Sequence, residues 1–171
     1  MKKLNQITLI LAGTLSLMAA NVSAGNPPKN GDAPFNSCFG EGKFDGDAYV
    51  TFKNANETDA IVCLVNVKTS ETVRNMFIGA GKNITMNEIP SGKYYLKVYY
   101  GNNWNTEKQN FCGTTGAFED DERFQKSDQK KDYVVIENTK QSYTIGTITL
   151  YGVVDGNMSS TPMSAQDFFT K

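Results

Sequence analysis

The sequence predicts an all-β fold, namely an antiparallel β-sandwich of about seven strands with one long loop. Short segments that alternate apolar and polar side chains recur along the chain, and this period of two residues is typical of half-buried strands. Clusters of Gly, Pro, Asn, Asp and Ser separate these segments at intervals of about ten residues, as expected for a sandwich. No segment in the first half of the chain shows the period of an amphipathic helix.

The first 24 residues are predicted to be a secretory signal peptide and not part of the fold. Lys2 and Lys3 form a basic start, residues 7–20 are an apolar stretch, and Val22 and Ala24 supply small residues for cleavage. The apolar stretch is too short to span a membrane, so a retained membrane anchor is the less favoured alternative. We therefore expect a periplasmic or secreted bacterial protein that has no membrane contact after cleavage.

Length and charge limit the number of domains and the kinds of partner. The chain left after cleavage suffices for one domain, which we divide into an irregular N-terminal segment, 25–47, and a β-sandwich, 48–171. Cleavage removes two lysines and no acid, so the formal charge changes from −1 to −3. A mildly acidic chain with scattered charges argues against nucleic acid and against an anionic membrane surface as partners.

The chain has three cysteines, so an exported protein can form one disulfide and leave one thiol free. Cys38 and Cys112 both lie in Gly-rich, loop-like sequence, whereas Cys63 lies within the apolar run 60–67. We interpret Cys63 as a small buried apolar residue and predict a Cys38–Cys112 disulfide. This bond joins the N-terminal segment to the long central loop, and it stabilises the fold by about 4 kcal/mol in the chain-entropy model.

The N-terminal segment, 25–47, is rich in Gly, Pro, Asn and Asp and has no periodicity, so we expect irregular structure held by the disulfide at Cys38. Asp45-Gly46-Asp47 has the composition of a calcium-binding turn. It lacks the further acidic ligands that such a loop needs, so we interpret it as a solvated turn.

Seven segments have the length and pattern of strands. Residues 60–67 are apolar on both faces as far as Asn66, which predicts a central strand of a sheet. The seven predicted strands are 49–52, 60–67, 73–78, 84–86, 94–99, 133–136 and 141–151.

The segment 83–104 is predicted to organise the rest of the chain, as two strands joined by a tight turn. Pro90 presets φ for that turn, and Gly92 follows it. After the turn two sets of side chains alternate, which predicts that one set faces the core and the other faces outward. The two sets are Tyr94, Leu96 and Val98, and Tyr95, Lys97 and Tyr99.

Residues 101–131 contain no convincing strand pattern and are predicted to form the long loop. Two interpretations of its aromatic side chains stay open: they pack the loop onto the sandwich, or they form a partner-binding face. The acidic run 119–122 is interpreted as a solvated face and not as a cation site, because it lacks ligands at defined offsets. The aromatic residues of the loop are Trp104, Phe111, Phe118 and Phe124.

The tail of the chain, from residue 158 on, is polar except at its end. Ser164 and Asp167 have the spacing of a helix capping box, with Asp in the place of the usual Glu or Gln. We predict that Phe168 and Phe169 dock this short turn onto the sheet.

Several segments together resemble known families. The Ile-Pro-x-Gly-x-Tyr-x-Leu turn at 89–96 looks like that of carboxypeptidase-regulatory-like, transthyretin-like and CnaB-like sandwiches. Most of 60–169 resembles small exported proteins of unassigned function from Bacteroidetes-type bacteria. The resemblance implies a seven-stranded immunoglobulin-like (transthyretin-like) sandwich and implies no catalytic residues. The segments that carry it are 60–67 with 72–81, 89–96, 101–104 and 146–152.

No catalytic, cofactor-binding or metal-binding residue is predicted. The chain has no histidine, which removes Ser–His and Cys–His nucleophile pairs and most zinc or copper sites. The Gly-rich stretch 79–82 lacks the spacing of a phosphate-binding loop. The acidic run 119–122 pairs carboxylates, but no apolar pocket is evident there to raise a carboxyl pKa. We therefore do not expect an enzyme.

We expect an exported, non-catalytic binding or accessory module that contacts another protein or a glycan. Tyrosines beside lysines on an outward strand face suit such contacts, although tyrosine is also a good strand former. Two alternatives stay open: an inhibitor or immunity-type protein that caps a toxin or enzyme, and a small-ligand carrier, which needs an apolar cavity. The predicted contact residues are Trp104, Phe111, Phe118, Phe124, Tyr95 and Tyr99.

Overall fold

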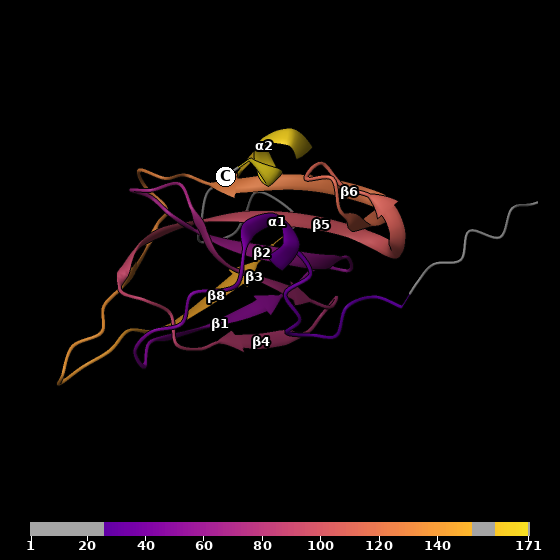
Figure 1. The fold of residues 1–171 in the computed structure, drawn as a ribbon. Coiled ribbons are helices and arrows are strands. Elements are labelled where there is room, and N and C mark those ends of the chain that lie inside the picture. The colour runs from indigo at the N-terminus through magenta and orange to yellow at the C-terminus, as the bar shows by residue number, and fades with distance from the viewer. Residues whose placement is uncertain (1–25, 152–159, 171) are drawn as a thin grey trace, which may run out of the picture.

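The structure, a computed structural model, describes residues 26–151 and 160–170, so the predicted signal peptide, 1–24, lies outside the described residues. The described chain is mostly β-structure, and its strands form two sheets that pack face to face (Figure 1). The predicted all-β sandwich is therefore confirmed, while its immunoglobulin-like subtype stays a prediction. Within the described part of the chain, no helix is long and apolar enough to cross a membrane.

The smaller sheet has three strands in the order β4-β1-β8. They are β1 (Tyr49–Asn54), β4 (Asn83–Met86) and β8 (Ile145–Leu150). β1 and β4 are antiparallel, whereas β1 and β8 run parallel, with Tyr49 opposite Ile145. The other described strand pairs are antiparallel, as predicted. The exception arises because the chain crosses from β7, in the larger sheet, to β8, in the smaller sheet.

The larger sheet runs in the order β3-β2-β5-β6-β9, and β7 pairs with the first residues of β5. β2 lies between β3 and β5 with its apolar side chains buried, which confirms the predicted central strand. The strands of this sheet are β2 (Asp59–Asn66), β3 (Thr72–Ile78), β5 (Gly92–Gln109), β6 (Thr115–Ser127), β7 (Val134–Ile136) and β9 (Ser160–Pro162).

The predicted hairpin of 83–104 is wrong, because its two strands lie in different sheets. β4 pairs with β1, and β5 pairs with β2. The connection between them carries the chain across the sandwich, where Ile89 is fully buried and its N–H donates to the carbonyl of Ala48 at 3.0 Å. Alternation of apolar residues identifies each strand, but it does not identify the partner strand.

The predicted long loop, 101–131, is also wrong, because most of it forms an antiparallel hairpin of β5 and β6. Asn, Asp and Glu dominate this part of both strands, and these residue types are depleted in strands. The Asn102 amide on β5 donates to the Asp121 carboxylate on β6 at 2.8 Å, so polar side chains pair across the hairpin. Asn103 and Asp121 have positive φ near a shift in register, and the hairpin curls there (Figure 1).

The main core lies between the two sheets, where the inward side chains of their strands meet. β1 and β8 contribute Phe52, Ile148 and Leu150 from the smaller sheet. The larger sheet contributes the inward set of each strand, including Val62, Leu64, Ile78, Tyr94, Leu96 and Val98.

A second apolar cluster covers the outer face of the larger sheet. Two short helices, α1 (Asn36–Phe39) and α2 (Ala165–Phe169), lie on this face, one from each end of the chain (Figure 1). Phe35 and Phe168 are fully buried there, with ring centroids 6.2 Å apart. The other buried members are Cys38, Ile61, Cys63, Val65, Phe77, Tyr95, Tyr99, Trp104, Phe118 and Phe169.

Helix α2 is fixed at both of its ends. The Ser164 hydroxyl accepts a hydrogen bond from the Asp167 N–H at 3.0 Å and donates to the Asp167 carboxylate at 2.7 Å, which confirms the predicted cap. At the other end the Lys97 ammonium donates to the carbonyls of Asp167, Phe168 and Thr170 at 3.0, 3.2 and 3.0 Å. Phe168 and Phe169 are buried against the sheet, as predicted.

The predicted Cys38–Cys112 disulfide is confirmed, and it joins residues that are 74 positions apart in the sequence. Cys38 belongs to α1, and Cys112 lies in the turn between β5 and β6. Cys63 is free and buried, as predicted. The disulfide therefore holds the N-terminal segment against the end of the long hairpin.

Candidate functional site

The structure buries four of the six predicted contact residues, so these four are not available as a binding face. Tyr95 and Tyr99 project from the outer face of β5, but both are buried in the apolar cluster on that face, where Phe35 and Phe168 pack against Tyr99. Period-two alternation shows which way a side chain projects, but it does not show what lies on top of it. The buried four are Tyr95, Tyr99, Trp104 and Phe118.

Tyr99 illustrates why this cluster is structural. Its hydroxyl accepts a hydrogen bond from the Phe118 N–H at 2.9 Å and donates to the Glu122 carboxylate. Its ring stacks on Phe124 with centroids 4.3 Å apart. Burial raises the pKa of the phenol far above its ordinary value, so this hydroxyl stays protonated.

The aromatic residues of the hairpin pack onto the sandwich, which supports the first of the two interpretations for most of them. Trp104 is 6% exposed and packs at 5.2 Å from Phe118 and 6.1 Å from Phe35, measured between ring centroids. Phe124 is partly buried beside the same cluster. Only Phe111 among the six predicted contact residues is well exposed, at 70%.

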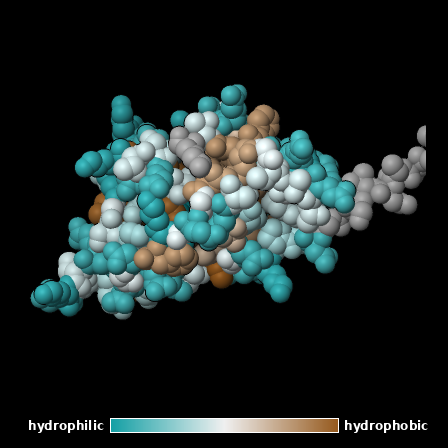
Figure 2. Space-filling model, in the orientation of Figure 1, coloured by the Kyte–Doolittle hydropathy of each residue, from teal (hydrophilic) through white to brown (hydrophobic). Residues whose placement is uncertain are grey.

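Phe111 stands at the tip of the β5–β6 hairpin, in a turn that is held by several bonds. The side-chain oxygen of Asn110 accepts from the N–H groups of Cys112 and Thr114 at 3.2 and 3.3 Å, and its amide donates to the Gly116 carbonyl. Cys112 is disulfide-bonded to α1. Phe111 is therefore an exposed ring on a braced turn. Figure 2 shows apolar side chains in the upper part of this face, in the region of α2, and a second apolar area lower down, in the region of β1, with hydrophilic side chains around both.

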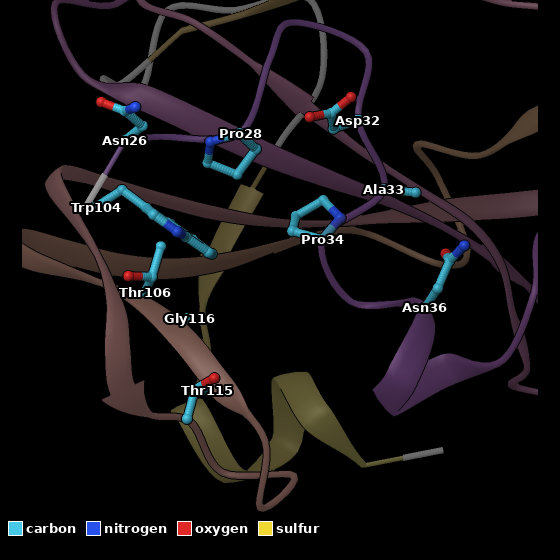
Figure 3. Close-up of a pocket in the computed structure, with 10 residues that line it drawn as sticks. All are labelled: Asn26, Pro28, Asp32, Ala33, Pro34, Asn36, Trp104, Thr106, Thr115 and Gly116. Atoms are coloured by element: carbon cyan, nitrogen blue, oxygen red, sulfur yellow. The ribbon is translucent and has the colours of Figure 1, made fainter.

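An open hollow of about 610 Å³ lies between the N-terminal segment and the β5–β6 hairpin (Figure 3). One wall is the chain that leads into α1, and the other wall is the hairpin, with Trp104 between them. The lining residues are Asn26, Pro28, Asp32, Ala33, Pro34, Asn36, Trp104, Thr106, Thr115 and Gly116.

The hollow combines ring surfaces with amide and hydroxyl groups. Pro28 and Pro34 supply flat apolar surface, and Trp104, which is 6% exposed, adds only the small accessible part of its ring. The asparagines and threonines of the walls supply donors and acceptors. Asp32 is the one lining residue that carries a charge. Among the described lining residues no second titratable side chain accompanies Asp32.

Local bonds fix the shape of both walls. The Asp32 carboxylate accepts from the Lys29 N–H at 2.7 Å, and the Asn36 side-chain oxygen accepts from the Asn75 amide at 2.9 Å. Gly116 has a φ of 107°, and a Cβ atom at that position would lie 2.7 Å from the Trp104 ring. Glycine is therefore needed there for the indole to lie against the hairpin.

Sequence reasoning found Trp104 but missed the N-terminal wall of the hollow. Pro28 and Pro34 lie in a segment without periodicity, and nothing in their pattern indicates a site. The one useful signal was the predicted disulfide, because it places the N-terminal segment beside the hairpin. From the predicted disulfide it could also have been inferred that the two joined segments enclose a space beside the bond.

The remaining polar clusters carry no evident chemistry. In the described residues no three His, Cys, Asp or Glu side chains are placed to hold a metal ion. In the acidic run, Glu119 and Glu122 accept ion pairs from Lys108 at 3.6 and 3.4 Å. Burial raises the pKa of the Cys63 thiol far above its ordinary value, so this thiol is unreactive.

Comparison of the chain with models of protein families, with curated proteins and with solved structures finds no match.

Proposed function

We propose that this chain is an exported, non-catalytic binding module and that its ligand is a neutral glycan bound in the hollow. The observation that carries the proposal is the composition of that hollow, which sets ring surfaces beside uncharged donors and acceptors. Its volume of about 610 Å³ falls within the range of sites that hold small ligands, roughly 300 to 1,000 Å³.

A glycan matches both kinds of surface. The C–H face of a sugar ring packs on flat apolar groups such as Pro28 and Pro34, and its hydroxyls exchange hydrogen bonds with amides and with other hydroxyls. Because the hollow is open, it accommodates a segment of a longer chain as well as a single sugar. A carrier of apolar ligands needs a more enclosed and more apolar cavity, so this alternative has less support.

Export supports the same proposal. The predicted signal peptide, 1–24, addresses the chain to the periplasm or to the outside of a bacterial cell. The Cys38–Cys112 disulfide fits an oxidising compartment of that kind. Neither nucleic acid nor a membrane surface is proposed as a partner, because the mature chain is mildly acidic.

The test uses residues 25–171, a panel of immobilised neutral oligosaccharides and isothermal titration of any that bind. Thr106→Trp and Thr115→Trp each fill the hollow from an exposed position on the hairpin wall, and we expect either one to weaken binding by about tenfold or more. Thr161→Trp, at an exposed position in β9 that does not line the hollow, is the matched control. Binding that survives both wall substitutions would contradict the assigned site. A panel without any binder would contradict the assigned ligand class.

One observation favours a second candidate function, an inhibitor that caps an exported enzyme or toxin. Phe111 presents an exposed ring on a turn braced by the disulfide, and rigid aromatic anchors of this kind dominate the energy of many protein interfaces. The test is affinity capture from periplasm and culture supernatant with the mature chain, followed by an activity assay of the captured protein. A stoichiometric partner that is inhibited by the wild type and not by Phe111→Ala would favour this function over glycan binding.

A further inference from the structure

The larger sheet protects its first edge with the N-terminal segment. At β3 the Gly31 N–H donates to the Phe77 carbonyl at 2.9 Å, and the Phe77 N–H donates to the Asp32 carbonyl at 2.8 Å. Further along, the Lys43 N–H donates to the Val73 carbonyl at 2.9 Å. This edge of the sheet is therefore not available to another chain.

The other edge of the larger sheet is protected by different means. β9 pairs with the end of β6, from Gln125 to Ser127. The preceding part of β6 carries the charged run 119–123 and the positive φ of Asp121. Charge and irregular backbone are the usual devices that keep an edge strand from pairing with another protein.

β8, at the edge of the smaller sheet, has none of these protections. Within the described residues β1 is its one partner strand, and no strand pairs with its other edge. Residues 141–151, which include β8, contain no charged residue and no proline. The register between β1 and β8 is continuous over all six residues, so no bulge interrupts the strand.

Exposed apolar side chains concentrate around the same edge. Ile145, Tyr143 and Tyr151 are 60%, 47% and 47% exposed. They lie on the outer face together with Thr147 and Thr149, while Ile148 and Leu150 face the core. These three are among the seven exposed large hydrophobic side chains of the described chain.

The hydrogen bonds to β1 identify which backbone groups of β8 point away from β1. Tyr49 N–H donates to the Thr144 carbonyl at 3.0 Å, and Ala55 N–H donates to the Leu150 carbonyl at 3.2 Å. In a parallel ladder the even-numbered residues of β8 therefore face β1. The N–H and C=O groups of Ile145, Thr147 and Thr149 consequently face the open edge.

We propose that β8 pairs antiparallel with β8 of a second copy of this chain, which joins two three-stranded sheets into one sheet across a two-fold axis. Centring the axis on Thr147 places Ile145 opposite Thr149 of the second copy and Tyr143 opposite Tyr151 of the second copy. A symmetric interface must be self-complementary, and an uncharged strand meets its own copy without repulsion between like charges. This inference uses no residue of the hollow and does not rest on glycan binding.

The first test compares association of the mature wild type with that of charged variants by analytical ultracentrifugation up to about 100 µM. We expect a dimer for the wild type. Thr147→Lys and Thr147→Glu each place like charges opposite one another at the axis, so we expect each variant alone to associate at least about tenfold more weakly. An equimolar mixture of the two restores the dimer, because opposite charges then face each other. Thr161→Lys, at an exposed threonine of β9, leaves the dimer unchanged.

The second test checks the register. A hydrogen-bonded antiparallel pair has its Cα atoms about 5.5 Å apart, which suits a disulfide. Thr147→Cys should therefore crosslink to its own copy under mild oxidation, whereas Thr149→Cys, which faces Ile145 of the second copy, should not. A wild type that stays monomeric at the highest concentration would overturn the proposal. So would a dimer that both charged variants leave intact, since it would form through another surface.

Discussion

The outer faces of the two sheets differ, because one is covered by other segments of the chain and the other is not. The outer face of the larger sheet carries Tyr95 and Tyr99, and segments from both ends of the chain cover it. The outer face of the smaller sheet carries a row of threonines, Thr51, Thr85 and Thr147, and exposed apolar side chains only along β8. In the described residues no helix lies on this face. The strands of both sheets alternate in the same way, so the residue types on the outward side make the difference.

This comparison teaches what decides whether a sheet face is covered. An outward row of large aromatic rings exposes apolar area, and burying it stabilises the fold by about 25 cal/mol per Å². An outward row of threonines loses little by staying in water, since its hydroxyls bond to one another or to solvent. Thr51 and Thr85, for example, are hydrogen-bonded across β1 and β4 at 2.9 Å. Covering the outer face of the larger sheet requires that the two terminal segments be ordered. The disulfide holds the N-terminal segment, and the hydrogen bonds of Lys97 hold α2.

The largest effect should come from removing the disulfide that attaches the N-terminal cover. Cys38→Ser combined with Cys112→Ser frees a loop of 74 positions, for which the chain-entropy model gives a loss of about 4 kcal/mol. Urea unfolding of the mature chain measures this loss. If stability changed by much less, the packing of Phe35 would hold the segment without help, and the covered face would not depend on the covalent bond.

Phe35→Ala should have the next largest effect, about 3 to 4 kcal/mol, because it leaves a cavity in the centre of the second cluster. Phe35 packs against Tyr99, Trp104, Phe168 and Phe169. Phe111→Ala is the matched control, since it removes an exposed ring and should change the free energy of unfolding by less than about 0.5 kcal/mol. Equal losses for the two variants would mean that the outer cluster contributes little stability.

Lys97→Met should destabilise the protein by about 1 to 2 kcal/mol, because three carbonyls at the end of α2 lose their donor. Burial lowers the pKa of Lys97 below its ordinary value of 10.5. Between the folded pKa and 10.5 the unfolded chain binds more protons, so the stability of the wild type rises with pH in that window.

The pH dependence separates the charge of Lys97 from its packing. Urea unfolding of both proteins from about pH 7 to pH 10 should show the advantage of the wild type growing with pH. The charged groups near Lys97 are Asp167 and Lys126. Glu88 instead lies near Arg74, on another part of the fold. An advantage that shrinks with pH would show that the folded state favours the ammonium form.

The smallest expected losses of stability compare the covered outer face with the uncovered one most directly. Ser164→Ala removes the cap of α2 and should cost about 1 kcal/mol, because the Asp167 N–H loses its partner. Thr85→Ala on the uncovered face removes a bond between two partly exposed hydroxyls and should cost less than about 0.5 kcal/mol. Thermal unfolding of the two variants measures the difference. A larger loss for Thr85→Ala would contradict the view that the smaller sheet needs no cover.

Much of the fold could be predicted from local patterns in the sequence. The apolar run of β2 indicated a buried central strand, and Ser164 with Asp167 indicated a capped turn with its two phenylalanines docked. These features depend on residues that lie close together in the sequence. The disulfide followed from elimination, because Cys63 lies within an apolar run.

The errors concern relations between distant segments. Strand 84–86 and the strand after it were assigned to each other, although each found its partner elsewhere. The hairpin arm near Asn102 was missed because Asn and Asp side chains pair across it where apolar alternation is absent. The hollow was missed for the same reason, since its walls come from residues 26–36 and 104–116 and meet only in the folded chain.

The position of Phe35 and Phe168 in one cluster has a consequence for the time course of folding. Residues near the two ends of the chain meet there, and β1 also pairs with β8, which follows it by about a hundred positions. High contact order of this kind places folding in the millisecond-to-second range of small β-proteins. Neither the outer cluster nor the β1–β8 pair can form before the residues of β8 and α2 have been synthesised. A partly synthesised or partly translocated chain without these residues therefore lacks this native packing, and α2 completes the outer cluster with Phe168 and Phe169.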